Sequence, residues 1–112
     1  MLYQNLAVWI RSRALSIDVY RTLLNCRDYG FKDQITRSAL SVPSNIAEGC
    51  ERESIKERHR FISIAKGSMG EFKTQADIGT EVGFIDREKG LQWQQEASEL
   101  SKMLGALLKK LK

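Results

Sequence analysis

Patterns typical of β-strands are what the sequence most clearly lacks. Its 112 residues include a single proline, Pro43, and no strand-like runs of Val, Thr and aromatic residues. Helices are therefore left to bury the apolar side chains, which make up 42% of the chain. A chain of this length forms one core. The sequence predicts a single all-α domain over residues 1–112.

Residues that carry catalysis or bind metals are also scarce. His59 is the only histidine, which excludes a zinc site built from several histidines. A di-iron site in a helical bundle needs paired Glu-x-x-His motifs, and Lys56 stands where the glutamate before His59 would be. We therefore expect no enzymatic activity, no metal and no cofactor. His59 is interpreted as an exposed or interfacial helix residue.

Long apolar runs are missing as well. None approaches the roughly 20 residues that a membrane span needs, and the first residues do not form an apolar signal segment. The two cysteines, Cys26 and Cys50, fall at opposite ends of a predicted helical hairpin, about 25–30 Å apart. A disulfide needs Cα atoms within about 7 Å. We therefore expect buried free thiols in a cytoplasmic protein with no membrane partner.

Apolar residues at spacings of three and four predict four helices. The first runs from Leu6 to Cys26, with Arg11 and Asp18 off its buried stripe. That stripe should consist of Leu6, Trp9, Ile10, Ala14, Ile17, Tyr20 and Leu24. A turn follows at residues 27–30, where Asp28 can act as the N-cap of the next helix.

The second predicted helix starts near Phe31. Its buried stripe should consist of Phe31, Ile35, Ala39, Val42 and Ile46. Pro43 should kink this helix, and Gly49 should end it. Asn45 and Ser44 are placed to satisfy backbone groups that Pro43 leaves unpaired; the alternative is that they line a ligand pocket.

The third predicted helix opens at Ser54 with a capping box and ends at Gly83. Its buried stripe should consist of Phe61, Ile62, Ala65, Met69, Phe72 and Ala76. Beside it runs a stripe of small residues formed by Ser63, Gly67, Gly70 and Thr74. Because small residues let another backbone approach, we expect close contact with a neighbouring helix there, or alternatively with another subunit.

The fourth predicted helix begins after Asp86 and has the most regular apolar seam. Its members are Trp93, Ala97, Leu100, Leu104, Leu107 and Leu111. Short connections place consecutive helices antiparallel. The expected fold is an antiparallel up-down-up-down four-helix bundle.

The charge of the chain is mildly basic and uneven. The net charge is +4, and residues 1–66 hold 11 Lys and Arg against 7 Asp and Glu. Four lysines also stand between Lys102 and Lys112. Candidate phosphate contacts around the second and third helices are Arg37, Arg52, Lys56, Arg58, Arg60 and Lys66. Glu48 should pair with Arg52 one turn later, and an ordinary ion-paired, solvated surface is the alternative interpretation.

Two motifs carry a family resemblance. They are Val42-Pro43-Ser44-Asn45-Ile46-Ala47-Glu48-Gly49 and Phe61-Ile62-Ser63-Ile64-Ala65-Lys66-Gly67-Ser68. With them the chain resembles, over nearly its whole length, the bacterial four-helix bundle proteins called 23S rRNA intervening-sequence proteins. It departs from the family pattern at Ser38, where a second basic residue is common, and at Cys50, where an aromatic is common.

The resemblance implies a bundle that assembles into a closed ring, typically a homopentamer, and no enzyme. Related bundles in diversity-generating retroelements are basic accessory subunits that bind nucleic acid and a reverse transcriptase. The leading hypothesis is therefore a homo-oligomeric accessory protein that binds nucleic acid, most plausibly structured RNA. The alternative is a protein–protein scaffold with no role in nucleic-acid binding.

Overall fold

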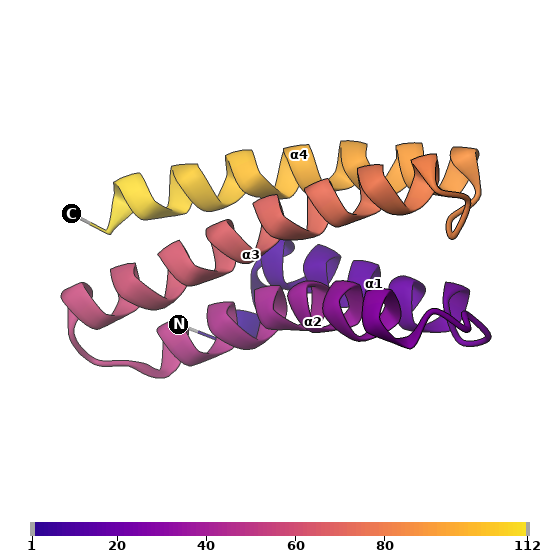
Figure 1. The fold of residues 1–112 in the computed structure, drawn as a ribbon. Coiled ribbons are helices and arrows are strands. Elements are labelled where there is room, and N and C mark those ends of the chain that lie inside the picture. The colour runs from indigo at the N-terminus through magenta and orange to yellow at the C-terminus, as the bar shows by residue number, and fades with distance from the viewer. Residues whose placement is uncertain (1, 112) are drawn as a thin grey trace.

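The computed structural model describes residues 2–111, so Met1 and Lys112 lie outside the description. After a short 3₁₀ helix, η1 (Tyr3–Asn5), come the four helices of the bundle. They are α1 (Ala7–Thr22), α2 (Tyr29–Glu51), α3 (Ile55–Glu81) and α4 (Arg87–Lys110). Each packs against the next along the chain, and α4 also contacts α1, which closes a bundle 42 Å long (Figure 1). The predicted all-α, up-down-up-down four-helix bundle is confirmed.

The core confirms the predicted stripes of the last three helices except at Phe61, which is only half-buried and lies under Arg52 and Arg60. The fully buried members are Ile35, Ala39, Val42 and Ile46 in α2; Ile62, Ala65, Met69, Phe72 and Ala76 in α3; and Trp93, Ala97, Leu100 and Leu104 in α4. Phe31, Leu107 and Leu111 pack at the edge of this core. Burial of a large apolar side chain contributes about 1.5–3 kcal/mol, so this cluster is the main stabilising feature.

The predicted stripe of α1 is largely wrong, since only Leu6 and Trp9 among its members pack at the edge of the core. The buried side chains are Val8, Ser12, Leu15, Ser16, Val19 and, beyond the helix end, Leu23. Ile10, Tyr20 and Leu24 are 49%, 43% and 67% exposed. The periodicity misled because two serines occupy core positions. The hydroxyl of Ser12 is satisfied there by donating to the carbonyl of Trp9 at 3.1 Å, so the residue is buried without an unpaired polar group.

Helix ends largely follow the predicted caps. The side chains of Asp28, Ser54 and Asp86 accept hydrogen bonds from the backbone N–H groups of Phe31, Glu57 and Lys89. Only half of the capping box forms, because the Glu57 side chain binds Arg60. Gly83 ends α3 with a φ of +87°, the left-handed conformation of a C-terminal glycine.

Two expectations for α2 are corrected. Gly49 does not end the helix, which continues to Glu51. A Cβ at Gly49 would lie 3.2 Å from the Cβ of Phe61, so the absence of a side chain at Gly49 lets α3 pack closely against α2. Pro43 lies inside the helix, and Asn45 does relieve the backbone nearby. Its Nδ2 donates at 2.8 Å to the carbonyl of Ser41, not to the carbonyl four residues before Pro43 that lacks its helical donor.

Close approach between helices occurs at glycines other than the predicted ones. A Cβ at Gly67 or Gly70 would meet no atom of residues 2–111 within 4 Å, so the expected contact with a neighbouring helix of the same chain is wrong. A Cβ at Gly79 would instead overlap an aromatic ring of α2, and one at Gly90 would overlap the side chain of Thr80. Gly90 therefore sets the close packing of α3 against α4.

Candidate nucleic-acid interface

The turn between α2 and α3 gathers three of the six predicted phosphate contacts. Arg52 and Arg60 lie over the ring of Phe61, each with its Cζ 5.0 Å from the ring centroid. Arg58 is half-buried and donates from Nε to the carbonyl of Arg52 at 2.6 Å. Arg52 also forms the predicted ion pair with Glu48. Arg52 and Arg58 thus have partners within the chain, and Arg60 is the most exposed of the three.

The other three predicted contacts lie apart from one another. Arg37 lies beside Tyr20, on the α1 side of α2, and pairs with Asp33 at 3.2 Å. Lys66 extends towards α4, where its Cε lies against Gly105. Lys56 is exposed in the first turn of α3. The six predicted residues therefore do not form a single surface.

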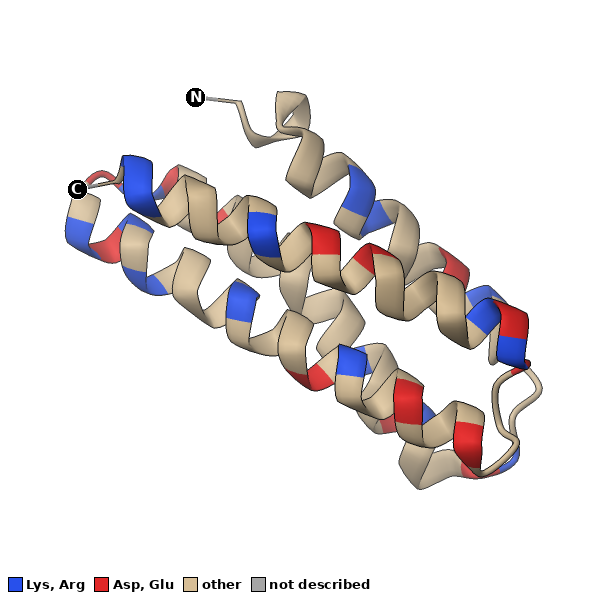
Figure 2. Cartoon of the chain, turned by 90° about the horizontal axis from the view of Figure 1, so that it is seen from above, with Lys and Arg blue, Asp and Glu red and all other residues tan. Residues whose placement is uncertain are grey.

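Lysines of α4, which were not among the predicted contacts, extend a basic surface. Because α3 and α4 are antiparallel, the first half of α3 lies beside the last turns of α4 (Figure 1). The term basic half denotes the exposed cations of this region: Lys56, Arg60, Lys66, Lys102, Lys109 and Lys110. Figure 2 shows blue concentrated along both helices toward the end near the C-terminus, and red further along them. The lysine-rich C-terminal stretch was the signal in the sequence, but only the fold shows that it lies beside Lys66.

The motif residues hold α2 against α3. The hydroxyl oxygens of Ser41 and Ser68 are 2.9 Å apart, and Asn45 Nδ2 lies 2.9 Å from the same Ser41 oxygen. Gly49 lets Phe61 approach α2 closely. These contacts give Asn45, Gly49 and Ser68 a structural role at the seam between the two helices. That geometry favours the structural interpretation of this segment over a ligand pocket.

Two polar contacts fix α4 against α1. Arg11 donates to both carboxylate oxygens of Glu96, with Nε 3.0 Å from Oε2. Asp18 accepts from Trp93 Nε1 at 2.7 Å and from Lys89 Nζ at 3.2 Å. Partial burial acts to raise the pKa of Asp18, but the hydrogen bonds from Trp93 and Lys89 outweigh it and lower the pKa below its usual value. Arg11 and Asp18 thus remain partly exposed but are held against α4 by these contacts.

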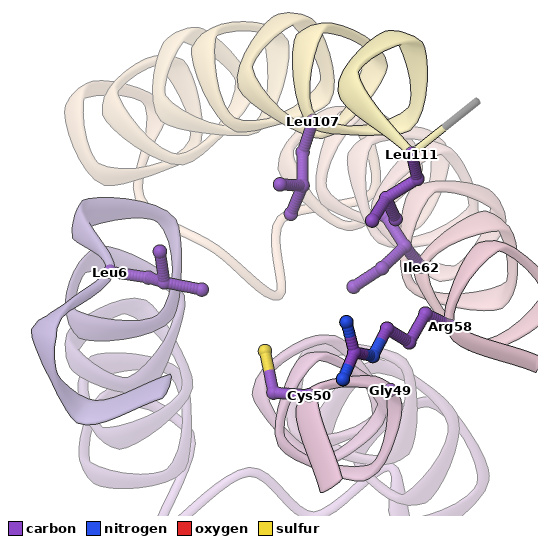
Figure 3. A pocket seen from close by; sticks show the side chains of 7 residues that line it. All are labelled: Leu6, Gly49, Cys50, Arg58, Ile62, Leu107 and Leu111. Carbon is purple, nitrogen blue, oxygen red and sulfur yellow. The ribbon is translucent and has the colours of Figure 1, made fainter. Parts of the chain in front are cut away.

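A small apolar pocket opens where the four helices converge (Figure 3). It is lined by Leu6, Gly49, Cys50, Arg58, Ile62, Leu107 and Leu111, and its volume is about 40 Å³. Ligand pockets usually measure about 300–1,000 Å³, so this one has room only for a water-sized molecule. Burial raises the pKa of the Cys50 thiol, which makes it a weak nucleophile at neutral pH. The pocket has no geometry suited to catalysis or to an organic ligand.

Large apolar side chains are also exposed along α1, in the turn that follows it and along α2. The term apolar surface denotes Ile10, Tyr20, Leu24, Tyr29 and Leu40, which are 43% exposed or more. Tyr20, Tyr29 and Leu40 line one shallow groove. Single exposed apolar residues are ordinary, but a group of them is typical of a contact surface.

The sequence between residues 4 and 106 matches the family model described as 23S rRNA-intervening sequence protein. The chain belongs to this family. It is also similar to a crystal structure of a protein with unknown function from the S23 ribosomal protein family of Bacteroides thetaiotaomicron, with a TM-score of 0.86 and 22% identity. The match covers 92% of this chain and 99% of that one, and at this identity it supports the fold alone. No curated protein sequence matches the chain.

Within residues 2–111 two further kinds of site are absent. No helix there is long and apolar enough to cross a membrane. No group of three or more His, Cys, Asp or Glu side chains in that range is placed to hold a metal ion. His59 is an exposed helix residue whose Nδ1 lies 3.5 Å from the hydroxyl of Ser63.

Proposed function

We propose that this member of the 23S rRNA-intervening sequence protein family is a non-enzymatic accessory protein that binds nucleic acid, structured RNA above all, as a homo-oligomer. The observation that supports the proposal is the basic half, in which cations from two distant parts of the sequence line adjacent helices. Phosphate contacts need positive charge but little geometry, so such a surface suits the backbone of a folded RNA.

The lysines of the basic half are available for this role. Of its six cations, only Arg60 has an ion-pair partner among residues 2–111, Glu57 at 3.5 Å. Lys102 and Lys109 are two helical turns apart on α4, about 10 Å, and both are exposed. Unpaired cations bind phosphate without first breaking an internal ion pair. Binding of this kind depends on counterion release and weakens steeply with salt.

The apolar surface supports the homo-oligomeric part of the proposal. Its five residues are exposed in the single chain. Burying them in a contact would stabilise that contact by about 25 cal/mol for each Å² of apolar area removed from water. We propose that it forms the contacts of a closed ring, with five copies as the expected number. The same surface could dock a different protein, which is the second candidate function; a stoichiometric protein partner that survives nuclease treatment would favour that candidate.

The test is binding of a structured RNA across a salt series. The variant combines Lys66→Glu, Lys102→Glu and Lys109→Glu. Its matched control, with the same change of charge outside the basic half, combines Arg27→Glu, Lys73→Glu and Arg87→Glu. Each lost phosphate contact reduces the steepness of log affinity against log salt by about 0.7–0.9, so the variant should lose about 2–3 units of slope. Equal binding by variant and control would contradict the proposed surface.

A further inference from the structure

The outward face of α3 carries a charge pattern that its own chain does not neutralise. Its first half presents Lys56 and Arg60, and its second half presents Asp77 and Glu81. This order opposes the helix macrodipole, which favours acidic side chains near the N-terminus and basic ones near the C-terminus. The adjacent α4 compensates little, because its lysine-rich C-terminal part lies beside the basic half of α3 (Figure 2), and of the two acidic residues only Glu81 pairs with α4 within residues 2–111, through Arg87.

The ion pairs that these four residues form within the chain are loose. Arg60 lies 3.5 Å from Glu57, and Glu81 lies 3.8 Å from Arg87. All four side chains in these two pairs are at least 40% exposed. Exposed pairs of this kind contribute little, so the charges of the face remain available for a partner.

We propose that this face of α3 pairs with the same face of a second copy of the chain, antiparallel, around a twofold axis that passes between Gly67 and Gly70. One register then neutralises the whole face. Lys56 faces Glu81 of the second copy, and Arg60 faces Asp77. Because the contact is isologous, each of these pairs occurs twice.

The centre of the face permits the close approach that this pairing needs. In the same register Ser63 faces Thr74, and Gly67 faces Gly70. A Cβ at either glycine would meet nothing within 4 Å among residues 2–111, so a second helix can lie against the backbone. Ile78, which is 53% exposed, would be covered by His59 of the second copy. The small residues only allow the contact; the charge order is what selects the partner.

Charge complementarity favours a second copy over other occupants. A nucleic acid carries negative charge throughout and would be repelled by Asp77 and Glu81. A different protein would need the same charge order in an antiparallel helix, and α3 itself has that order. An isologous contact joins only two copies and cannot by itself close a ring. If the apolar surface forms a ring, the α3 contact would therefore join that ring to a second one. The pairing uses Lys56 and Arg60 and leaves the other cations of the basic half, Lys66, Lys102, Lys109 and Lys110, free for RNA. The inference does not depend on nucleic-acid binding.

The test uses two complementary charge reversals of the full chain. Variant one combines Lys56→Glu with Arg60→Glu, and variant two combines Asp77→Lys with Glu81→Lys. The mass of each, measured by light scattering without nucleic acid, should be half that of the wild type, because like charges then face each other. Mixing the two variants, or combining all four substitutions in one chain, should restore the full mass. Controls with the same change of charge are Lys109→Glu with Lys110→Glu, and Glu51→Lys with Glu53→Lys, which should keep the wild-type mass.

A cysteine cross-link measures the register independently. In a chain whose native cysteines are serine, Ser63→Cys with Thr74→Cys should form a covalent dimer on oxidation. Ser63→Cys alone should not, because the two copies of residue 63 would lie about 16 Å apart along the paired helices, beyond the reach of a disulfide. Equal masses for the wild type and both reversal variants would overturn the proposal. If the wild type then bound RNA through Lys56 and Arg60, this face of α3 would be assigned to RNA binding and not to a second copy.

Discussion

Asp18 allows the sharpest prediction about stability. Its carboxylate accepts the indole N–H of Trp93 at 2.7 Å, and Trp93 is only 2% exposed. Replacing Asp18 with alanine leaves that donor buried without a partner, which costs about 1–3 kcal/mol. The lost pair with Lys89 adds less than about 1 kcal/mol, because both side chains are partly exposed. Asp18→Asn keeps an acceptor oxygen and should lose about 1 kcal/mol or less.

The measurement is urea unfolding followed by circular dichroism, at neutral and acidic pH. The pKa of Asp18 is lower in the folded than in the unfolded protein, so its charge stabilises the fold above about pH 4, the unfolded value. That contribution is lost as the pH falls through the lowered folded pKa. The difference between the wild type and Asp18→Ala should therefore narrow below pH 4.

The matched control is Asp33→Ala, which removes an exposed carboxylate paired with Arg37 and orphans no buried donor. It should cost no more than about 0.5 kcal/mol. The reasoning is refuted if Asp18→Ala is as stable as this control, or if Asp18→Asn is as destabilised as Asp18→Ala. Either result would mean that the hydrogen bond to Trp93 contributes nothing.

Three further predictions concern glycine and cysteine. Gly90→Ala should destabilise the bundle by about 1–3 kcal/mol in thermal unfolding, because its Cβ would overlap the side chain of Thr80; a neutral result would contradict the close packing of α3 against α4. Gly67→Ala should raise the unfolding free energy of the dilute, dissociated chain by up to about 1 kcal/mol, since its Cβ meets nothing, while weakening the pairing of α3. Cys50 should react more slowly than an unstructured cysteine with an alkylating reagent at pH 8, because burial raises its pKa, and mass spectrometry of the labelled peptide would show this; an equal rate would contradict it.

The sequence was most informative where periodicity was unbroken. The seam from Trp93 to Leu111 placed α4 correctly, and the caps at Asp28 and Asp86 placed the starts of two helices. In α1 the same reasoning chose the wrong face, because Ser12 can be buried once its hydroxyl binds the backbone. The spacing of apolar residues cannot predict that a serine is buried when its hydroxyl donates to a nearby backbone carbonyl.

The candidate interface was less predictable, because it depends on contacts between distant residues. Lys66 was identified from its neighbours in sequence, yet its position beside Gly105 arises from the packing of α3 on α4. Arg37 was grouped with it but lies beside Tyr20, on the other side of α2. Likewise, Asp18 and Trp93 are separated by 75 residues, and no local spacing suggests their hydrogen bond.

The most direct test of the proposed function is binding of the purified, nuclease-treated protein to a structured RNA at increasing salt, with its mass measured by light scattering in the same buffers. We predict an oligomer whose affinity falls steeply with salt, and whose affinity and salt dependence are both reduced by Lys66→Glu, Lys102→Glu and Lys109→Glu but not by the matched control. An oligomer that binds no RNA even at low salt would contradict the account and assign its surfaces to a protein partner.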